Sequence, residues 1–442
     1  MDTMQSKRIL FANFPADGHF NPLTSLAVHL KSLGHDVRWY TSDTYAEKIH
    51  RLGIPFYPLQ RVLDISKGSP DELFPERRHQ KSQLSKLKFD IKNVFLRRGV
   101  EFFQDVSAIE KTFPFDLVVC DITFTGLWFI EEKLGKPVIA VGVLPLMATS
   151  NDLPPSGLGL APSNSRWGRL KQQAMRWLSD VSVFRESNFL IRQLFRENGL
   201  KQERGNIFDT LYQKSTLVLQ SGTPGLEYPR SDLSARIWFI GPLFPYSFGE
   251  KSVFRHHEKI RQYDRVILVT QGTVEKDPEK LLVPTLEAFK NTEYLVIATT
   301  GGSGTESLRR RYPQSNVVIE DFIPFGEVMP FCHVYVTDGG YGGVLLSIQN
   351  KLPLVTAGVH EGKNEINARV GYFQLGVNLK TEKPAPAQVK QAVEEVLRNP
   401  VYKQRVEQLS DQFSQYNSLR LCEEYVNHIH AVDQLPTEVP LS

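Results

Sequence analysis

The stretch that decides the fold is Arg8-Ile-Leu-Phe-Ala-Asn-Phe14, followed by the loop Pro15-Ala-Asp-Gly-His-Phe20 and by Asn21-Pro22. The first seven residues form a short apolar run, which is typical of a fully buried strand. Asn21 and Pro22 predict the start of a helix, because Asn is a favoured N-cap and Pro fits the first helical position. Apolar residues then recur at helical spacing, and Gly34 predicts the end of that helix.

The same alternation of strand and helix continues through the first half of the chain. Apolar runs of strand length, separated by helical patterns, lie at His35–Tyr40, Phe115–Cys120, Pro137–Val143 and Thr216–Leu219. Strands that alternate with helices build a parallel sheet with helices on both faces. The first half is therefore predicted to be a doubly wound α/β domain.

A stretch rich in Pro, Gly and Ser, Ser221–Ser247, interrupts this pattern and predicts a domain boundary. Five new strand-like runs follow it: Arg265–Thr270, Tyr294–Thr299, Val317–Ile319, Val334–Thr337 and Leu354–Ala357. A chain of 442 residues also exceeds the ~250 residues at which single cores stop growing. The sequence predicts two similar α/β domains.

Composition excludes several classes of protein. Lys and Arg number 52 against 49 acidic residues, so the net charge of +3 gives no support for nucleic-acid binding. The three cysteines are odd in number and far apart, which fits neither a disulfide framework nor a zinc site. The apolar run near the N-terminus is too short for a signal sequence or a membrane span, so we expect a cytoplasmic location.

His19 is the first candidate for chemistry. It follows a predicted strand, and ligands of open α/β sheets bind beyond the carboxyl ends of the strands. A neutral imidazole can accept a proton from a hydroxyl, and a carboxylate on its other nitrogen would fix the tautomer. Asp121, at the end of another predicted strand, is the expected partner. The alternative is a solvated or capping histidine.

A glycine cluster, Thr337-Asp-Gly-Gly-Tyr-Gly-Gly343, lies between a predicted strand and the helical run Val344–Asn350. Backbone N–H groups at such a helix start can bind a pyrophosphate, although a tight turn alone would also explain the glycines. Thr300-Gly-Gly-Ser-Gly304 resembles a second phosphate loop. No clear helix start and no Lys-Ser/Thr follow it, so we interpret it as a mobile loop.

Two further segments have a functional and a structural interpretation. Phe322 precedes the glycine cluster and offers a ring on which a nucleobase could stack, whereas core packing is the alternative. Ser150–Trp167 is rich in Pro, Gly and Ser, which is typical of an active-site lid and equally of a solvated surface loop.

At this point the motifs show a family resemblance. The Asp-Gly-His-Phe-Asn-Pro loop at residues 17–22, together with residues 322–369, resembles the family 1 nucleotide-sugar glycosyltransferases. The likeness is stronger to bacterial members acting on natural products, flavonoids among them. Those members carry a Gly-Gly-Tyr-Gly-Gly turn and a segment ending in Asn-Ala-Arg-Val, here Gly339–Gly343 and Glu361–Val370.

The resemblance implies the GT-B fold, in which two Rossmann-like domains face each other across a cleft. It implies an acceptor-binding domain at residues 1–225, a linker at 226–262 and a donor-binding domain at 263–415. A C-terminal helix within 416–442 is expected to cross back to the first domain.

The resemblance also implies roles for individual residues. His19 matches the general base of the family and Asp121 its supporting acid. The residues that match the donor-binding positions, or flank them, are Gln271, Gly272, Thr273, Phe322, Ile323, Gly339, Gly340, Tyr341, Gly342, Gly343, Glu361, Lys363 and Asn364. The candidate acceptor-binding aromatics of the first half are Phe14, Phe20, Phe124 and Trp128, for which core packing is the alternative.

Three departures from the family pattern concern the donor. Asp338 stands where many relatives have a phosphate-binding His, so we expect it not to contact the phosphates directly. Leu346 replaces a Glu that binds the ribose hydroxyls of uridine donors. The acid and Gln that hold sugar hydroxyls in plant relatives are missing, and Glu361–Glu365 occupies that neighbourhood. These changes favour thymidine-diphosphate rhamnose as donor, with uridine-diphosphate glucose next.

The expected activity is therefore metal-independent transfer of a sugar, with inversion, to a hydroxyl of a small aromatic acceptor. No resident cofactor is expected, and the nucleotide sugar is a co-substrate. Two alternatives remain open: an epimerase or phosphorylase on the same architecture, and an inactive auxiliary protein that binds a nucleotide. A nicotinamide oxidoreductase is least compatible, because no Gly-x-Gly-x-x-Gly follows the first strand.

Overall fold

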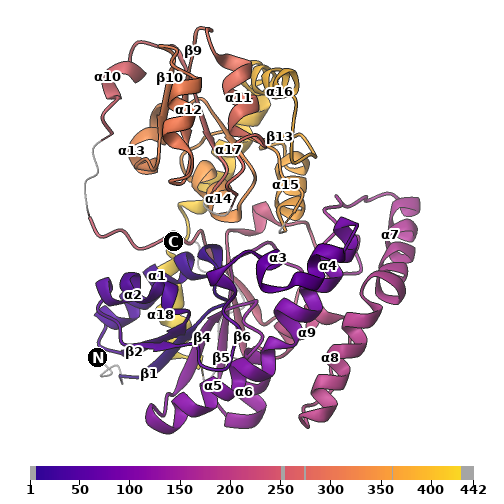
Figure 1. Cartoon of the computed structure of the whole chain (residues 1–442). Helices are drawn as coiled ribbons and strands as arrows, with labels where there is room; N and C mark the ends of the chain where they lie inside the picture. The colour runs from indigo at the N-terminus through magenta and orange to yellow at the C-terminus, as the bar shows by residue number, and fades with distance from the viewer. Residues whose placement is uncertain (1–5, 250–253, 273–274, 361, 430–442) are drawn as a thin grey trace.

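The computed structural model describes residues 6–249, 254–272, 275–360 and 362–429, which form two α/β halves (Figure 1). In the described residues of the first half, seven parallel strands form one sheet in the order β3-β2-β1-β4-β5-β6-β7. The strands are β1 (Arg8–Ala12), β2 (Asp36–Thr41), β3 (Phe56–Pro58), β4 (Leu117–Asp121), β5 (Val138–Gly142), β6 (Leu217–Ser221) and β7 (Ile237–Gly241). The predicted doubly wound sheet is confirmed.

The second half contains a six-stranded parallel sheet in the order β10-β9-β8-β11-β12-β13. Its strands are β8 (Arg265–Thr270), β9 (Tyr294–Thr299), β10 (Val317–Glu320), β11 (Val334–Thr337), β12 (Leu354–Thr356) and β13 (Gly376–Asn378). β8, β9 and β11 have the predicted bounds, because each is a continuous apolar run buried on both faces.

Helices cover both faces of each sheet. In the first half the longer ones are α1 (Asp17–Ser32), α4 (Gln83–Asp90), α5 (Arg98–Thr112), α6 (Leu127–Leu134), α7 (Arg166–Leu178), α8 (Arg185–Glu197) and α9 (Ile207–Gln213). In the second half they are α11 (Leu282–Phe289), α12 (Thr305–Arg311), α14 (Tyr341–Gln349), α15 (Lys363–Tyr372), α16 (Pro386–Arg398) and α17 (Pro400–Phe413). α18 (Ser418–Asn427) is the last described helix, and none of the helices in the described ranges is long and apolar enough to span a bilayer.

Strand residues alternate between two apolar cores in each half. In β1, Leu10 packs on one face of the sheet, whereas Ile9 and Phe11 pack on the other. The second sheet shows the same division, with Leu268 on one face and Ile267 on the opposite face. Because helices cover both faces, the carboxyl ends of the strands are the edge on which loops can form a site.

The first helix differs from its prediction. α1 begins at Asp17, four residues before Asn21, so Pro22 lies inside the helix and not at its first position. The backbone N–H of Phe20 already donates to the carbonyl of Ala16 at 2.9 Å. His19 therefore lies in the first turn of a helix rather than in a loop. The predicted end is confirmed, because Gly34 follows α1 with φ 90°.

The first domain extends beyond the predicted boundary at residue 225. β7 lies inside the stretch assigned to the linker at 226–262, yet it pairs in parallel with β6 and completes the first sheet. This strand was missed because it is short and flanked by Pro, Gly and Ser. β3 and β13, three residues each, were also not predicted.

The loop Thr300–Gly304 also differs from its prediction, because α12 begins directly after it, at Thr305, with Gly304 as N-cap. Gly304 has φ 72°, a left-handed conformation that glycine adopts without strain.

The end of the described chain packs on the first domain. α18 adds Leu421, Cys422 and Tyr425 to the apolar core that contains α1. Nε2 of His29 on α1 lies 3.0 Å from Oε2 of Glu423. The C-terminal helix therefore covers the first sheet, although it follows the second one in sequence (Figure 1).

The aromatic core around α1 yields a prediction for stability. Phe20 is fully buried and lies 4.4 Å from the ring of Tyr45 and 4.8 Å from that of Trp39, measured between centroids. Phe20→Ala should lower the free energy of unfolding of the first domain by about 3–5 kcal/mol, because it leaves a cavity. Chemical denaturation measures this, with Leu233→Ala, an exposed site, as the control. A loss below about 1 kcal/mol would contradict the packing.

Candidate active site

His19 and Asp121 are brought together by neighbouring strands. β1 and β4 pair in parallel, so the helix that follows β1 starts beside Asp121, the last residue of β4. Nδ1 of His19 lies 2.9 Å from Oδ1 of Asp121. Asp121 is fully buried, and its Oδ2 also accepts the backbone N–H of Phe14 at 2.6 Å. The predicted pair therefore exists as a contact.

Thr123 completes this arrangement, and the sequence interpretation missed it. Its backbone N–H donates to Oδ1 of Asp121 at 2.9 Å, and its Oγ1 lies 3.0 Å from Nδ1 of His19. Its position could have indicated this role, because Thr123 follows Asp121 by two residues, in the turn after a predicted strand. A carboxylate only accepts hydrogen bonds. The contact between Asp121 and His19 therefore assigns the ring proton to Nδ1. Nε2 of His19 then carries a lone pair, and none of the described residues hydrogen-bonds to it.

Of the four predicted acceptor aromatics, only Phe14 lies at this pair. Its ring stacks on Phe95 at 4.5 Å and meets the His19 ring edge-on at 5.5 Å. Phe20, Phe124 and Trp128 are at most 1% exposed, so the assignment of these three to acceptor contacts is wrong in this structure. They pack in the apolar cores because they belong to buried helix faces and turns.

The glycine turn lies at the start of α14, as predicted. Gly339 has φ 92°, and a Cβ there would lie 1.9 Å from Oδ1 of Asn367, so no other residue fits. Gly340 is the N-cap of α14, and a Cβ on Gly342 would meet nothing within 4 Å. The N–H groups of Gly339 and Gly340 donate to Thr337 and Asp338, so the N–H groups that an anion could bind are those of the first turn of α14 after Gly340. Gly343 lies one residue further, with Tyr335 beside it.

Tyr341 has a different role from the predicted donor contact. It is buried, and its hydroxyl donates to the carbonyl of Ser221 at the end of β6 at 2.8 Å. Burial raises the pKa of this hydroxyl, so it stays protonated as a donor. Since Ser221 ends a strand of the first sheet and Tyr341 follows a strand of the second, the carboxyl edges of the two sheets face each other. Helices α1 and α14 are also in contact there.

Asp338, at the start of the turn, is paired and does not face the site as an isolated acid. Its Oδ2 lies 2.9 Å from Nζ of Lys363, and both side chains are largely buried. Lys363 is the first residue of α15. The position that carries a His in many relatives therefore holds an ion pair that includes a cation.

The loop Ser150–Trp167 contacts the donor half directly. Oε1 of Glu365 accepts the N–H groups of Gly157 and Gly159, each at 2.8 Å. Asn364 donates from Nδ2 to the carbonyl of Gly157 at 3.0 Å. Asn364, predicted to bind the donor, thus holds this loop in place.

Arg369 links the two halves from a buried position. Its Nη2 lies 2.8 Å from Oε2 of Glu227, its Nη1 lies 3.1 Å from Oε2 of Glu365, and it covers the ring of Tyr228 at 4.4 Å. Burial alone lowers the pKa of Arg369, but the two carboxylates raise it above its ordinary value. The guanidinium is therefore charged and fully engaged.

The remaining donor candidates divide into exposed and buried residues. Phe322 is 68% exposed and lies close to Gly302, whereas Ile323 is buried in the core.

Gln271, the first donor candidate after β8, is also buried. Its Nε2 donates to the carbonyl of Asp277 at 2.8 Å, and its Oε1 accepts the N–H groups of Leu281 and Leu282. Its side chain therefore anchors the loop that follows β8. Gly272 adopts φ 73°, and Thr273 and Glu361 lie outside the described residues.

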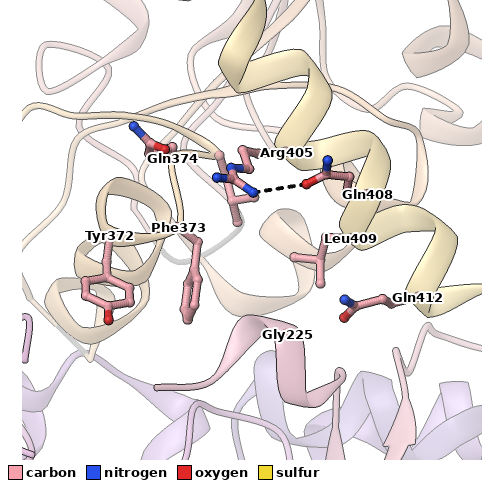
Figure 2. Close-up of a pocket in the computed structure, with 9 residues that line it drawn as sticks. Gly225, Tyr372, Phe373, Gln374, Arg405, Gln408, Leu409 and Gln412 are labelled. Atoms are coloured by element: carbon pink, nitrogen blue, oxygen red, sulfur yellow. Dashed lines mark hydrogen bonds between the residues drawn. The ribbon is translucent and has the colours of Figure 1, made fainter. Parts of the chain in front are cut away.

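Other parts of the described chain offer no competing centre. No group of three or more His, Cys, Asp or Glu within the described ranges is arranged to hold a metal ion. Burial raises the pKa of Cys332 and of Cys422 to about 12, so neither supplies a thiolate. A cavity of about 300 Å³ lies between the end of α15, α17 and the turn at Gly225 (Figure 2). None of the predicted site residues lines it.

The Arg369 network yields a second prediction. Arg369→Met should lower the free energy of unfolding by about 3–5 kcal/mol, because Glu227 and Glu365 would stay buried without their counter-charge. Denaturant unfolding followed by tryptophan fluorescence measures the loss. Arg398→Met, at an exposed ion pair, should change stability by less than about 1 kcal/mol. Equal effects of the two substitutions would rule out the bridging role.

A family model described as "UDP-glucoronosyl and UDP-glucosyl transferase" matches residues 272–415. The chain is 32% identical over 410 residues to 4'-demethylrebeccamycin synthase of Lentzea aerocolonigenes, covering 92% of this chain and 96% of that protein. UDP-glucosyltransferase A1 of Starmerella bombicola is 27% identical over 438 residues, which cover 96% and 93% of the two chains.

Solved structures agree on the fold. The crystal structure of the kitacinnamycin glycosyltransferase superposes with a TM-score of 0.74 at 16% identity, covering 96% of this chain and all of that one. The expected GT-B architecture of two facing sheets is thereby confirmed. Full-length similarity at 32% identity and this shared fold show that the chain belongs to family 1 of the UDP-glycosyltransferases and is a nucleotide-sugar glycosyltransferase.

Proposed function

We propose that this enzyme transfers a sugar, with inversion, from a nucleoside diphosphate to a hydroxyl of a small aromatic acceptor, with His19 as the general base. The contact between Nδ1 of His19 and the buried carboxylate of Asp121 carries the proposal. It leaves Nε2 as the proton acceptor at the edge where α1 meets α14. Thr123 and Phe14 hold the ring in this orientation.

The proposed reaction is a single displacement. Nε2 of His19 takes the acceptor's hydroxyl proton while the hydroxyl oxygen forms a bond to the anomeric carbon. The bond from that carbon to the pyrophosphate oxygen breaks on the opposite face, which inverts the configuration. Asp121 stabilises the imidazolium that forms, and general-base assistance of this kind contributes about 10²–10⁴-fold to a rate.

The donor side has two sources of positive potential for the leaving pyrophosphate. The first is the first turn of α14 after Gly340, with N–H groups that do not have to reorganise during the reaction. The second is Lys363, which Asp338 holds at the start of α15. The pair keeps a cation near the position where relatives use His. Phe322, with 68% of its surface exposed, supports stacking on the nucleobase.

For the donor we propose thymidine-diphosphate rhamnose, with uridine-diphosphate glucose as the second candidate. Leu346 on α14 is partly buried against the core of the second half that contains Leu268, and it offers no carboxylate to a ribose 2′-hydroxyl. The name of the Starmerella relative, a UDP-glucosyltransferase, supports the second candidate. The name of the Lentzea relative refers to a natural product, 4'-demethylrebeccamycin, which supports a small-molecule acceptor.

The role of His19 yields the third prediction. His19→Ala should lower kcat for transfer to a phenolic acceptor by at least about 10²-fold, because it removes the group that takes the hydroxyl proton. The Kd for the nucleoside diphosphate should change less than about twofold, since the donor lies on the other half. Calorimetry measures that Kd and product formation measures kcat. The control, His50→Ala on an exposed helix position, should retain activity. Turnover of His19→Ala within about threefold of the wild type would refute the role.

The donor proposal yields the fourth prediction. With one flavonoid acceptor, transfer from thymidine-diphosphate rhamnose should exceed transfer from uridine-diphosphate glucose, and the mass gain of the product distinguishes deoxyhexose from hexose. Leu346→Glu should shift the kcat/KM ratio toward the uridine donor by about tenfold, since a charged hydrogen bond contributes about 1.5–3 kcal/mol. A wild-type preference for uridine-diphosphate glucose would overturn the donor assignment and leave that of His19 intact.

A further inference from the structure

Helix α7 carries an apolar stripe on its solvent-facing side. Trp167, Leu170, Trp177 and Leu178 are 82%, 57%, 67% and 55% exposed. Their spacing places them within one face of a helix, where surface helices normally bury apolar residues. Val181, one turn further on, is also exposed. Within the described residues nothing covers this stripe, which we call the α7 stripe.

The opposite side of α7, which faces the protein, is polar. Gln172 is the buried residue of the helix; its Nε2 donates to the carbonyl of Asp152 at 2.9 Å, and its Oε1 accepts the N–H of Ser163. Arg176, on the same side, donates to the carbonyl of Leu153. These bonds fix the rotation of the helix about its axis. The exposure of the stripe therefore follows from specific contacts.

Basic residues accompany the stripe. α7 contains Arg166, Arg169, Lys171 and Arg176 and no acidic residue. At 100° per residue, Arg166 lies along one border of the stripe and Lys171 along the other, while Arg169 lies further round the helix. Long basic side chains beside tryptophans are the composition of helices that lie in a lipid interface.

We propose that α7 docks this enzyme on a lipid surface that carries anionic headgroups. The apolar stripe would enter the boundary between headgroups and acyl chains, and Arg166 and Lys171 would contact the headgroups. Tryptophan favours that boundary because its ring is apolar and its N–H is polar.

Charge argues against a second copy of the chain as the occupant. An isologous contact would place the same helix against itself, and the stripe is bordered by two cations, Arg166 and Lys171, on a helix without an acidic residue. An anionic surface complements this charge. Position agrees, because α7 and α8 lie at the outer edge of the first half (Figure 1).

The test uses the full chain with vesicles of phosphatidylcholine, with and without phosphatidylglycerol. The wild type should co-sediment with the anionic vesicles, less at high salt and less with neutral vesicles, because Lys and Arg near such a surface contribute about 1 kcal/mol each, or roughly fivefold. Its tryptophan emission should shift to shorter wavelength. The shift reports on α7, because Trp39 and Trp128 are already buried and Trp238 packs against Tyr425 of α18, away from α7.

Two paired variants and two matched controls complete the experiment. Leu170→Gln with Leu178→Gln, and Arg166→Glu with Lys171→Glu, should each lower the partition coefficient at least about tenfold and leave transfer to a water-soluble acceptor unchanged. The controls are Leu63→Gln with Phe331→Gln, exposed apolar sites elsewhere, and Lys390→Glu with Arg398→Glu on α16; both should bind like the wild type.

Three results would overturn the proposal. The first is that the wild type does not bind anionic vesicles or binds neutral ones equally well. The second is that the α7 variants bind like the wild type. The third is that sedimentation equilibrium shows self-association that the Leu170→Gln and Leu178→Gln pair abolishes, which would make the stripe an interface between copies.

Discussion

One guanidinium, that of Arg369, is held between a carboxylate from each half of the chain. Glu227 follows the end of β6 in the first sheet, and Glu365 belongs to α15 in the second half. Glu365 in turn accepts two N–H groups from the loop that follows β5. Because these charges are buried, breaking one contact leaves the others without compensation. This network holds the carboxyl edges of the two sheets against each other, and both halves of the candidate site lie on those edges.

The first of these halves depends on Asp121. Its two carboxylate oxygens accept the N–H groups of Phe14 and Thr123 and contact Nδ1 of His19, while the residue itself is fully buried. A carboxylate held in this way cannot turn toward solvent, so the imidazole has one orientation. On the other half, the glycine turn starts α14, and Lys363 at the start of α15 is paired with Asp338. The proposed transfer from a nucleotide sugar to a hydroxyl assigns the base to the first of these halves and the pyrophosphate to the second.

Much of the fold could be predicted from the sequence, because buried parallel strands such as β8 and β9 are continuous apolar runs between turn residues. β7 was missed because its neighbours suggested a linker, and only its pairing with β6 makes it a strand of the first sheet. The start of α1 was placed too late because Asn21-Pro22 resembles a helix start, while the backbone bonds that define the helix begin at Ala16.

The site was predictable where strand order alone determines it and not where side-chain packing does. His19 and Asp121 meet because β1 and β4 are neighbours. Whether an aromatic lines a site or a core depends on tertiary burial, so Phe14 and Phe124 looked equivalent in sequence although only Phe14 reaches His19. The ion pair between Asp338 and Lys363 could not be predicted either, since Lys363 lies on another element, 25 residues further along the chain.

The most direct test of the account is a double-mutant cycle on kcat for His19→Ala and Asp121→Asn. If Asp121 acts only by orienting and stabilising the imidazole, His19 and Asp121 act as a unit, and their separate losses in kcat do not add. The double variant should then turn over no more slowly than His19→Ala alone. Multiplication of the two single losses would show that the residues act independently, and would contradict the account.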